Sequence, residues 1–169
     1  MRHGKMWTVL ALAVVACTSG DTILGTPSFD ALDESLPNGV HGHFLAGSYA
    51  GGRQTVHVVL QTREVDFSSY QGVVEFDQGV FRLVSVSTPK TDTHFSNQSE
   101  AANGQLPIAG FATDGFDEPI SITLSFATPR MFKTGDIYLK LDVVGTSIGA
   151  EVPPALIYLR RELVQGSGG

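Results

Sequence analysis

The sequence predicts an all-β fold: a nine-stranded β-sandwich with jelly-roll topology, preceded by a signal peptide and a flexible linker. From Val40 onward, short runs rich in β-branched residues alternate apolar with polar positions, and each run ends at Gly, Pro, Asn or Asp. Turn signals recur about every 8 to 12 residues, which is the spacing of two packed antiparallel sheets. No stretch has the period of a long amphipathic helix.

The first element is a targeting segment, residues 1–16. Arg2 and Lys5 make its start basic, residues 6–16 are an apolar run, and small residues precede Cys17, which is the layout of a secretory signal peptide. The run has eleven residues, whereas a helix needs about 20 to cross a bilayer of about 30 Å. We therefore expect this segment to be cleaved rather than to span the membrane.

Cys17 is the only cysteine of the chain, so no disulfide can form within it. Val14-Val15-Ala16-Cys17 resembles the lipobox of bacterial lipoprotein precursors, and the resemblance implies that Cys17 becomes the first residue of the mature protein and carries acyl chains. More than one acyl chain anchors a protein stably, because each buried methylene contributes about 0.8 kcal/mol. An ordinary signal peptide with an incidental cysteine is the alternative.

The resemblance also bears on localisation. An aspartate after the cysteine tends to mark inner-membrane retention in the lipoprotein family, and Thr18 stands at that position here. We therefore expect an exported lipoprotein of the cell envelope, with the outer membrane or cell surface favoured. Residues 17–39, rich in Thr, Ser, Gly, Asp and Pro, are expected to be a tether, residues 40–164 the sandwich domain and residues 165–169 a flexible tail.

Nine strands are expected within the domain, and their apolar residues recur at every second position. In the second strand Val56, Val58 and Leu60 share one face, and in the seventh Ile120, Ile122, Leu124 and Phe126 alternate with Ser and Thr. In the eighth, Ile137, Leu139, Leu141 and Val143 are predicted to point inward. The expected strands are residues 40–45, 54–61, 70–76, 80–86, 93–96, 105–111, 120–126, 137–143 and 155–163.

The charge balance excludes one large class of partner. The chain has 11 basic and 17 acidic residues, a formal charge of −6, and removal of Arg2 and Lys5 with the signal peptide leaves 9 against 17, or −8. Such a surface repels phosphate backbones, so nucleic-acid binding is not expected.

The order of the strands and the residues at their ends resemble the cohesin family, the β-sandwich modules that receive dockerins in bacterial polysaccharide-degrading assemblies. The segments that carry the resemblance are FSSYQGVVEFDQGVFRLVSVSTP, NGQLPIAGFATDG, PISITLSFATP and GDIYLKLDVVGTSIGAEV. They extend over nearly the whole mature domain. The sequence departs from the family at Gln78, where a proline is usual, and at Pro107, which interrupts a strand that the family fills with β-branched residues.

The resemblance implies a protein-docking surface on the outward side of one sheet. Alternation along residues 70–76 and 105–111 assigns outward positions to both strands. An exposed Val73 and Phe111 among polar neighbours would form an apolar anchor with a polar rim; alternatively, a bulge at Pro107 or Gly110 turns Phe111 inward. The residues assigned to partner binding are Gln71, Val73, Glu75, Gln105, Ala109 and Phe111.

Other polar residues give only weak signals. Asp114, Asp117 and Glu118 offer oxygen ligands for calcium in one loop, but without EF-hand spacing, so an ordinary acidic turn is the alternative. His41 and His43 could share a strand face and a metal, or form a solvated pair. His57 and His94 are expected at outward surface positions.

No catalytic constellation and no cofactor site is found, so we do not expect an enzyme. The leading hypothesis is a non-catalytic envelope binding module that recruits a dockerin-like protein and contacts the membrane only through its lipid anchor. A carbohydrate-binding module would instead need an exposed ring from Tyr49, Tyr70, Tyr138 or Tyr158 beside polar groups. A third hypothesis is a structural envelope protein that self-associates by edge-strand pairing.

Overall fold

The computed structural model describes residues 36–88 and 93–165, apart from the side chains of residues 162, 164 and 165. The predicted signal peptide, Cys17, residues 17–35 of the predicted tether and residues 166–169 of the predicted tail lie outside the described residues.

Nine strands make up the described chain, and each lies where the sequence predicts one. The predicted β-sandwich is thereby confirmed. Two short 3₁₀ helices were not expected: η1 (Gln98–Asn103), which Asn97 caps, and η2 (Pro154–Leu156). The strands are β1 (Gly39–Ala50), β2 (Arg53–Arg63), β3 (Ser69–Phe76), β4 (Arg82–Ser87), β5 (His94–Ser96), β6 (Gln105–Phe111), β7 (Ile120–Ala127), β8 (Ile137–Gly145) and β9 (Ile157–Gln165).

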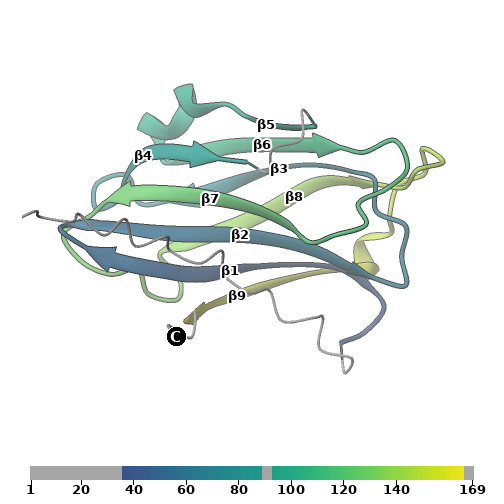
Figure 1. The fold of residues 1–169 in the computed structure, drawn as a ribbon, viewed down its shortest axis with the longest axis horizontal. Helices are drawn as coiled ribbons and strands as arrows, with labels where there is room; N and C mark the ends of the chain where they lie inside the picture. The colour runs from purple at the N-terminus through teal and green to yellow at the C-terminus, as the bar shows by residue number, and fades with distance from the viewer. Residues whose placement is uncertain (1–35, 89–92, 166–169) are drawn as a thin grey trace, which may run out of the picture.

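The strands form two sheets that pack face to face (Figure 1). One sheet has five strands in the order β4-β7-β2-β1-β9, and the other has four in the order β5-β6-β3-β8. The first and last strands, β1 and β9, lie side by side and are parallel. All other neighbouring strands are antiparallel. The chain repeatedly crosses between the sheets, which gives the predicted jelly roll.

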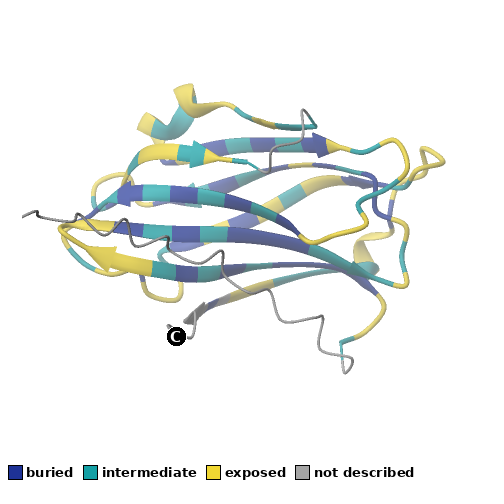
Figure 2. Ribbon diagram, in the orientation of Figure 1, coloured by how far each residue is buried: buried dark blue, intermediate teal, exposed yellow. Residues whose placement is uncertain are grey.

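The core lies between the inner faces of the two sheets, as the alternating bands of burial along the strands show (Figure 2). The predicted inward residues of β2 and β7 are all buried there. The four-stranded sheet adds residues from β3, β6 and β8. Burial of one such side chain contributes roughly 1.5–3 kcal/mol, so this layer stabilises the chain without a disulfide. These residues are Val56, Val58, Leu60, Ile120, Ile122, Leu124, Phe126, Tyr70, Val74, Leu106, Ile108 and Ile137.

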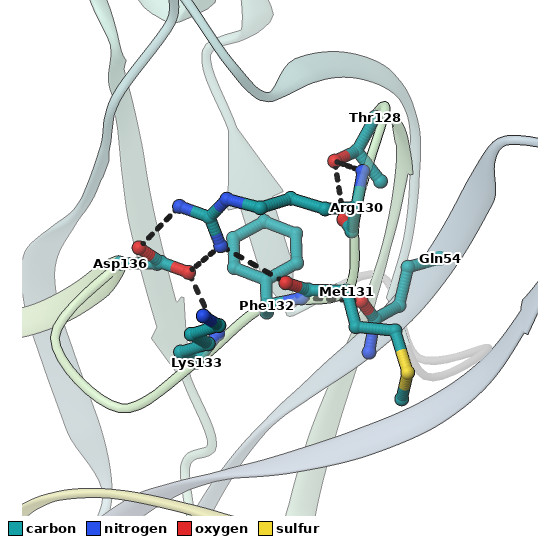
Figure 3. Close-up of polar contacts among 7 residues, drawn as sticks. All are labelled: Gln54, Thr128, Arg130, Met131, Phe132, Lys133 and Asp136. Carbon is teal, nitrogen blue, oxygen red and sulfur yellow. Dashed lines mark hydrogen bonds and ion pairs between the residues drawn. The ribbon is translucent and has the colours of Figure 1, made fainter.

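The loop between β7 and β8 is held by polar contacts that fix where β8 begins (Figure 3). Arg130 donates to both carboxylate oxygens of Asp136, at 2.6 and 2.9 Å, and these hydrogen bonds are the main reason why the pKa of Asp136 lies below its ordinary value. The amide of Phe132 donates to Gln54 Oε1 on β2 at 2.7 Å. The first residue of β8, Ile137, follows directly.

Candidate functional site

The outer face of the four-stranded sheet carries the residues that the sequence assigns to partner binding. On β3, Tyr70, Gly72, Val74 and Phe76 are buried, and the residues between them point outward. On β6 the residues at alternate positions from Gln105 to Phe111 also point outward. The alternation thus brings all six predicted residues onto one surface: Gln71, Val73, Glu75, Gln105, Ala109 and Phe111.

Phe111 points outward, so the alternative that a bulge turns it inward is wrong. The pairing of β3 with β6 runs without a break from Ser69 opposite Phe111 to Glu75 opposite Gln105, and Phe111 is 52% exposed. Pro107 does not interrupt the strand. Its carbonyl accepts from the amide of Asn97, so its nitrogen also faces the β5 side, away from β3. The missing donor therefore falls toward the edge of the sheet, where proline is tolerated.

Phe95 on β5 extends this surface, and the sequence analysis missed it. Phe95 is 56% exposed and pairs with Ala109, and its ring lies 6.3 Å from the Phe111 ring with only 14° between their planes. Two neighbouring aromatic rings on a sheet surface form a broad apolar contact area. The sequence pattern did not identify Phe95 as an outward residue because β5 has only three residues, too few to establish an alternation.

Val143 on β8 points outward, which corrects the prediction that it points inward. The pairing of β3 with β8 shifts between Gln71, opposite Val143, and Gly72, opposite Leu141. The extra residue, Asp142, makes a β-bulge, which reverses the alternation beyond it. Val144 is consequently buried, and Val143 is 45% exposed.

Gly72 is the sequence signal for this bulge. A side-chain carbon placed on Gly72 would lie 2.1 Å from the carbonyl oxygen of Lys140, so only glycine fits opposite the bulge. A glycine inside a strand pattern commonly marks a bulge or a close backbone approach. The glycine within YQGVVEF therefore indicated the bulge that turns Val143 outward.

The part of this face that lies over β8 combines an aromatic ring with charges. Tyr138 is 41% exposed, and Lys140 Nζ donates to Glu75 Oε1 at 2.6 Å across the β3–β8 pair. Because both side chains are partly exposed, this ion pair contributes at most about 1 kcal/mol. The outer face is thus apolar over β5 and β6 and mixed over β8.

His94 lies behind this face, not on it, which corrects its predicted outward position. Its Nδ1 is hydrogen-bonded to the Tyr70 hydroxyl at 3.0 Å, and its ring stacks on Phe116 at 5.6 Å. Desolvation lowers the pKa of His94 and raises that of Tyr70. These contacts hold the short strand β5 against the sheet. They also leave room only for glycine at position 110, where a side-chain carbon would lie 2.6 Å from His94.

The outer face of the five-stranded sheet is different in character. His41 and His43 do share this face, but they are not a solvated pair. His41 is 3% exposed, its Nε2 donates to the Pro37 carbonyl at 2.8 Å, and its ring stacks on Tyr158. His57 lies on this face as predicted, hydrogen-bonded to the Thr123 hydroxyl at 3.1 Å. Burial is the main cause of the lowered pKa of both His43 and His57.

The predicted calcium ligands do not come together. Asp114, Asp117 and Glu118 are all exposed in the loop between β6 and β7. Within residues 36–88 and 93–165, no three His, Cys, Asp or Glu side chains are grouped so that they could hold a metal ion. The same part of the chain contains no helix that is long and apolar enough to cross a bilayer.

No protein-family model and no curated protein matches the sequence. Solved structures do match the fold. One is the sixth cohesin of scaffoldin B from Acetivibrio cellulolyticus, solved in complex with a Cel5 dockerin. It has 12% identity and a TM-score of 0.55 over 72% of this chain and 94% of that chain.

Two further cohesins match over similar lengths. A type I cohesin from Clostridium thermocellum, solved as the Coh-OlpC-Doc435 cohesin–dockerin complex, has 9% identity and a TM-score of 0.55 over 76% of this chain and 93% of that chain. A non-cellulosomal cohesin from the archaeon Archaeoglobus fulgidus has 14% identity and a TM-score of 0.50 over 70% of this chain and 86% of that chain. The chain therefore has the fold of a cohesin domain, as the sequence resemblance implied.

Proposed function

We propose that this chain is a non-catalytic binding module of the cell envelope that recruits a dockerin-type protein through the outer face of its four-stranded sheet. The observation that carries the proposal is the apolar strip on that face, made by Phe95 and Phe111 with Val73 between polar neighbours. Aromatic side chains surrounded by a polar rim are the composition of a protein-binding hot spot.

The similar cohesins support the choice of partner. Two of them were solved as complexes with dockerins, and the present chain has the same sandwich architecture. We therefore expect a partner that presents a helical surface with apolar side chains to the aromatic pair. A place in polysaccharide degradation is part of the proposal, and it follows from the role of dockerins in such assemblies.

A pull-down with a soluble chain of residues 22–169, which contains all nine strands, tests the proposal. The bait is incubated with the envelope and secreted proteins of the organism that produces it, with and without a calcium chelator. One strongly retained protein that is lost on chelation supports a dockerin-type partner, because dockerins are the calcium-binding half of the pair. Retention on an insoluble polysaccharide without a protein partner, or concentration-dependent self-association alone, contradicts it.

The envelope anchor is tested separately, because Cys17 lies outside the described residues. We expect Cys17→Ala to prevent acylation and to move the protein from the membrane fraction to the soluble fraction. Fractionation of cells that express either form, followed by immunoblotting, measures this shift. If the variant stays with the membranes, Cys17 is not the anchor.

A further inference from the structure

A groove lies on the open side of the sandwich, between β8 and β9, which are edge strands of the two sheets. Its volume is about 440 Å³, within the range of roughly 300–1,000 Å³ that is typical of small-ligand sites. Its inner wall is apolar and consists of Phe44, Leu139 and Leu159. Its rim carries Tyr138 and Lys140 from β8, Glu75 from β3, which is paired with Lys140, and two arginines from β9.

The two arginines reach the rim because β9 bulges. Gly42 of β1 pairs with Leu159, but Phe44 pairs with Leu163, so one residue of β1 faces three of β9. In a regular strand Arg160 and Arg161 would point to opposite faces, whereas here both are exposed and both line the groove. Bulges that re-aim side chains are frequent beside binding sites.

Neither guanidinium forms an ion pair with a carboxylate among the side chains that the structure describes. The ion pairs among the described residues are Arg130–Asp136 and Lys140–Glu75, and no described carboxylate pairs with Arg160 or Arg161. Two adjacent guanidinium groups beside the Lys140–Glu75 ion pair make a local cationic site in a chain with a formal charge of −6. A guanidinium binds a carboxylate through two parallel hydrogen bonds, which a lysine cannot offer.

We propose that this groove binds an acidic sugar, with the carboxylate of a uronic acid unit held by Arg160 and Arg161 and a sugar face against the Tyr138 ring. Tyr138 is exposed beside polar groups, which is the condition that carbohydrate binding requires. Tyr70 is buried, and one face of the Tyr158 ring is stacked on His41. The site does not depend on the proposed protein partner.

An acidic peptide is another anionic ligand, and the strand edges disfavour it. An extended peptide binds an edge by continuing the regular ladder of backbone hydrogen bonds. The β9 bulge breaks that regularity, and such bulges protect edges against strand addition. Near its end β8 is already covered, because the amide of Val152 donates to the Val144 carbonyl and Glu151 forms a bridge with Gly145.

The test is a calorimetric titration of the purified protein with tri-galacturonate, with its methyl ester as a neutral probe of the same shape and hexaglutamate as a peptide probe. We expect tri-galacturonate to bind, and the ester and the peptide to bind at least about tenfold more weakly, a difference of about 1.4 kcal/mol. Equal binding of the ester or of hexaglutamate, or no binding of tri-galacturonate, overturns the proposal.

Variants locate the site. Arg160→Gln with Arg161→Gln should weaken tri-galacturonate binding at least about tenfold, and Tyr138→Ala about three- to tenfold. The matched control is Arg53→Gln with Arg82→Gln, which removes the same charge from exposed positions on other strands and should leave binding unchanged. An equal loss in the control pair would assign the effect to net charge and contradict the site.

Discussion

The two outer faces of the sandwich are built by the same alternation but carry different residues. The four-stranded sheet exposes Phe95, Phe111, Tyr138 and Val143 from three of its strands. Of the large apolar side chains that the structure describes, the five-stranded sheet exposes only Tyr49 on β1 and Val84 on β4, which are not neighbouring strands, and between them it presents polar side chains such as His57 and Thr123. An exposed cluster of large apolar side chains is uncommon on a monomer and marks an interaction surface. The difference favours the four-stranded face as the proposed binding surface.

The largest expected effect is on partner binding. Phe95→Ala with Phe111→Ala should weaken binding of the captured partner at least roughly 100-fold, because aromatic hot spots contribute about 2 kcal/mol or more each. Surface plasmon resonance with the immobilised domain measures this. The control is Tyr49→Ala with Val84→Ala, exposed apolar residues on strands of the other sheet, which should bind normally. Comparable loss in both pairs would contradict the difference between the faces.

The next effect in size is on stability, at the bulge that exposes Val143. Gly72→Ala should lower the free energy of unfolding by about 1–3 kcal/mol, since a methyl group there collides with the backbone carbonyl of Lys140 and the strand must shift. Urea denaturation followed by circular dichroism measures the loss. Gly79→Ala is the control, because its new methyl group meets only the side chain of Asp77, at 3.2 Å. A fully stable Gly72→Ala protein would mean that the bulge does not require glycine.

The sequence was sufficient to predict the nine strands and the faces of β3 and β6, because each runs in unbroken alternation there. It failed at Val143 because a bulge adds one residue without any change in composition, and only Gly72 signals it. Phe95 was missed since β5 is too short for periodicity. The partners of His94 come from distant segments, so its inward position depends on tertiary packing with Tyr70 and Phe116.

The shared position of Arg160 and Arg161 also could not be predicted from local sequence patterns. Two adjacent arginines in a strand predict side chains on opposite faces. They share a groove only because β9 pairs with β1 in parallel and bulges there. Pairing between the first and last strands of a chain cannot be found from local patterns.

Acid should destabilise the protein through partly buried histidines in both sheets. The pKa values of His43, His57 and His94 are lowered, with burial as the largest cause for each. Below about pH 6.5 the unfolded chain therefore binds more protons than the folded one. Stability that is complete above that pH is lost as the pH falls toward the folded-state values.

We expect the melting temperature to fall between pH 7.5 and 5.5. The double variant His43→Gln with His57→Gln, on the five-stranded outer face, should reduce this fall in melting temperature more than His94→Gln does behind the four-stranded face. Differential scanning calorimetry of the unsubstituted protein and of both variants, at both pH values, measures the fall in melting temperature of each. A melting temperature that rises as the pH falls would contradict the direction of the shifts.

The smallest expected effect is at Pro107, in the middle of the apolar face. The Asn97 amide already donates to the Pro107 carbonyl. In an antiparallel pair that exchanges both hydrogen bonds, the amide added by Pro107→Val would donate to the Asn97 carbonyl. The new hydrogen bond would stabilise the protein by about 0.5–1.5 kcal/mol. Without proline the unfolded chain gains conformational entropy, which would destabilise the protein by about 0.4–1 kcal/mol. The melting temperature should thus change little, while hydrogen exchange at the Asn97 amide slows. Ile108→Pro, whose nitrogen faces β3, should instead unfold the sheet; similar behaviour of both variants would contradict the assigned direction of the Pro107 nitrogen.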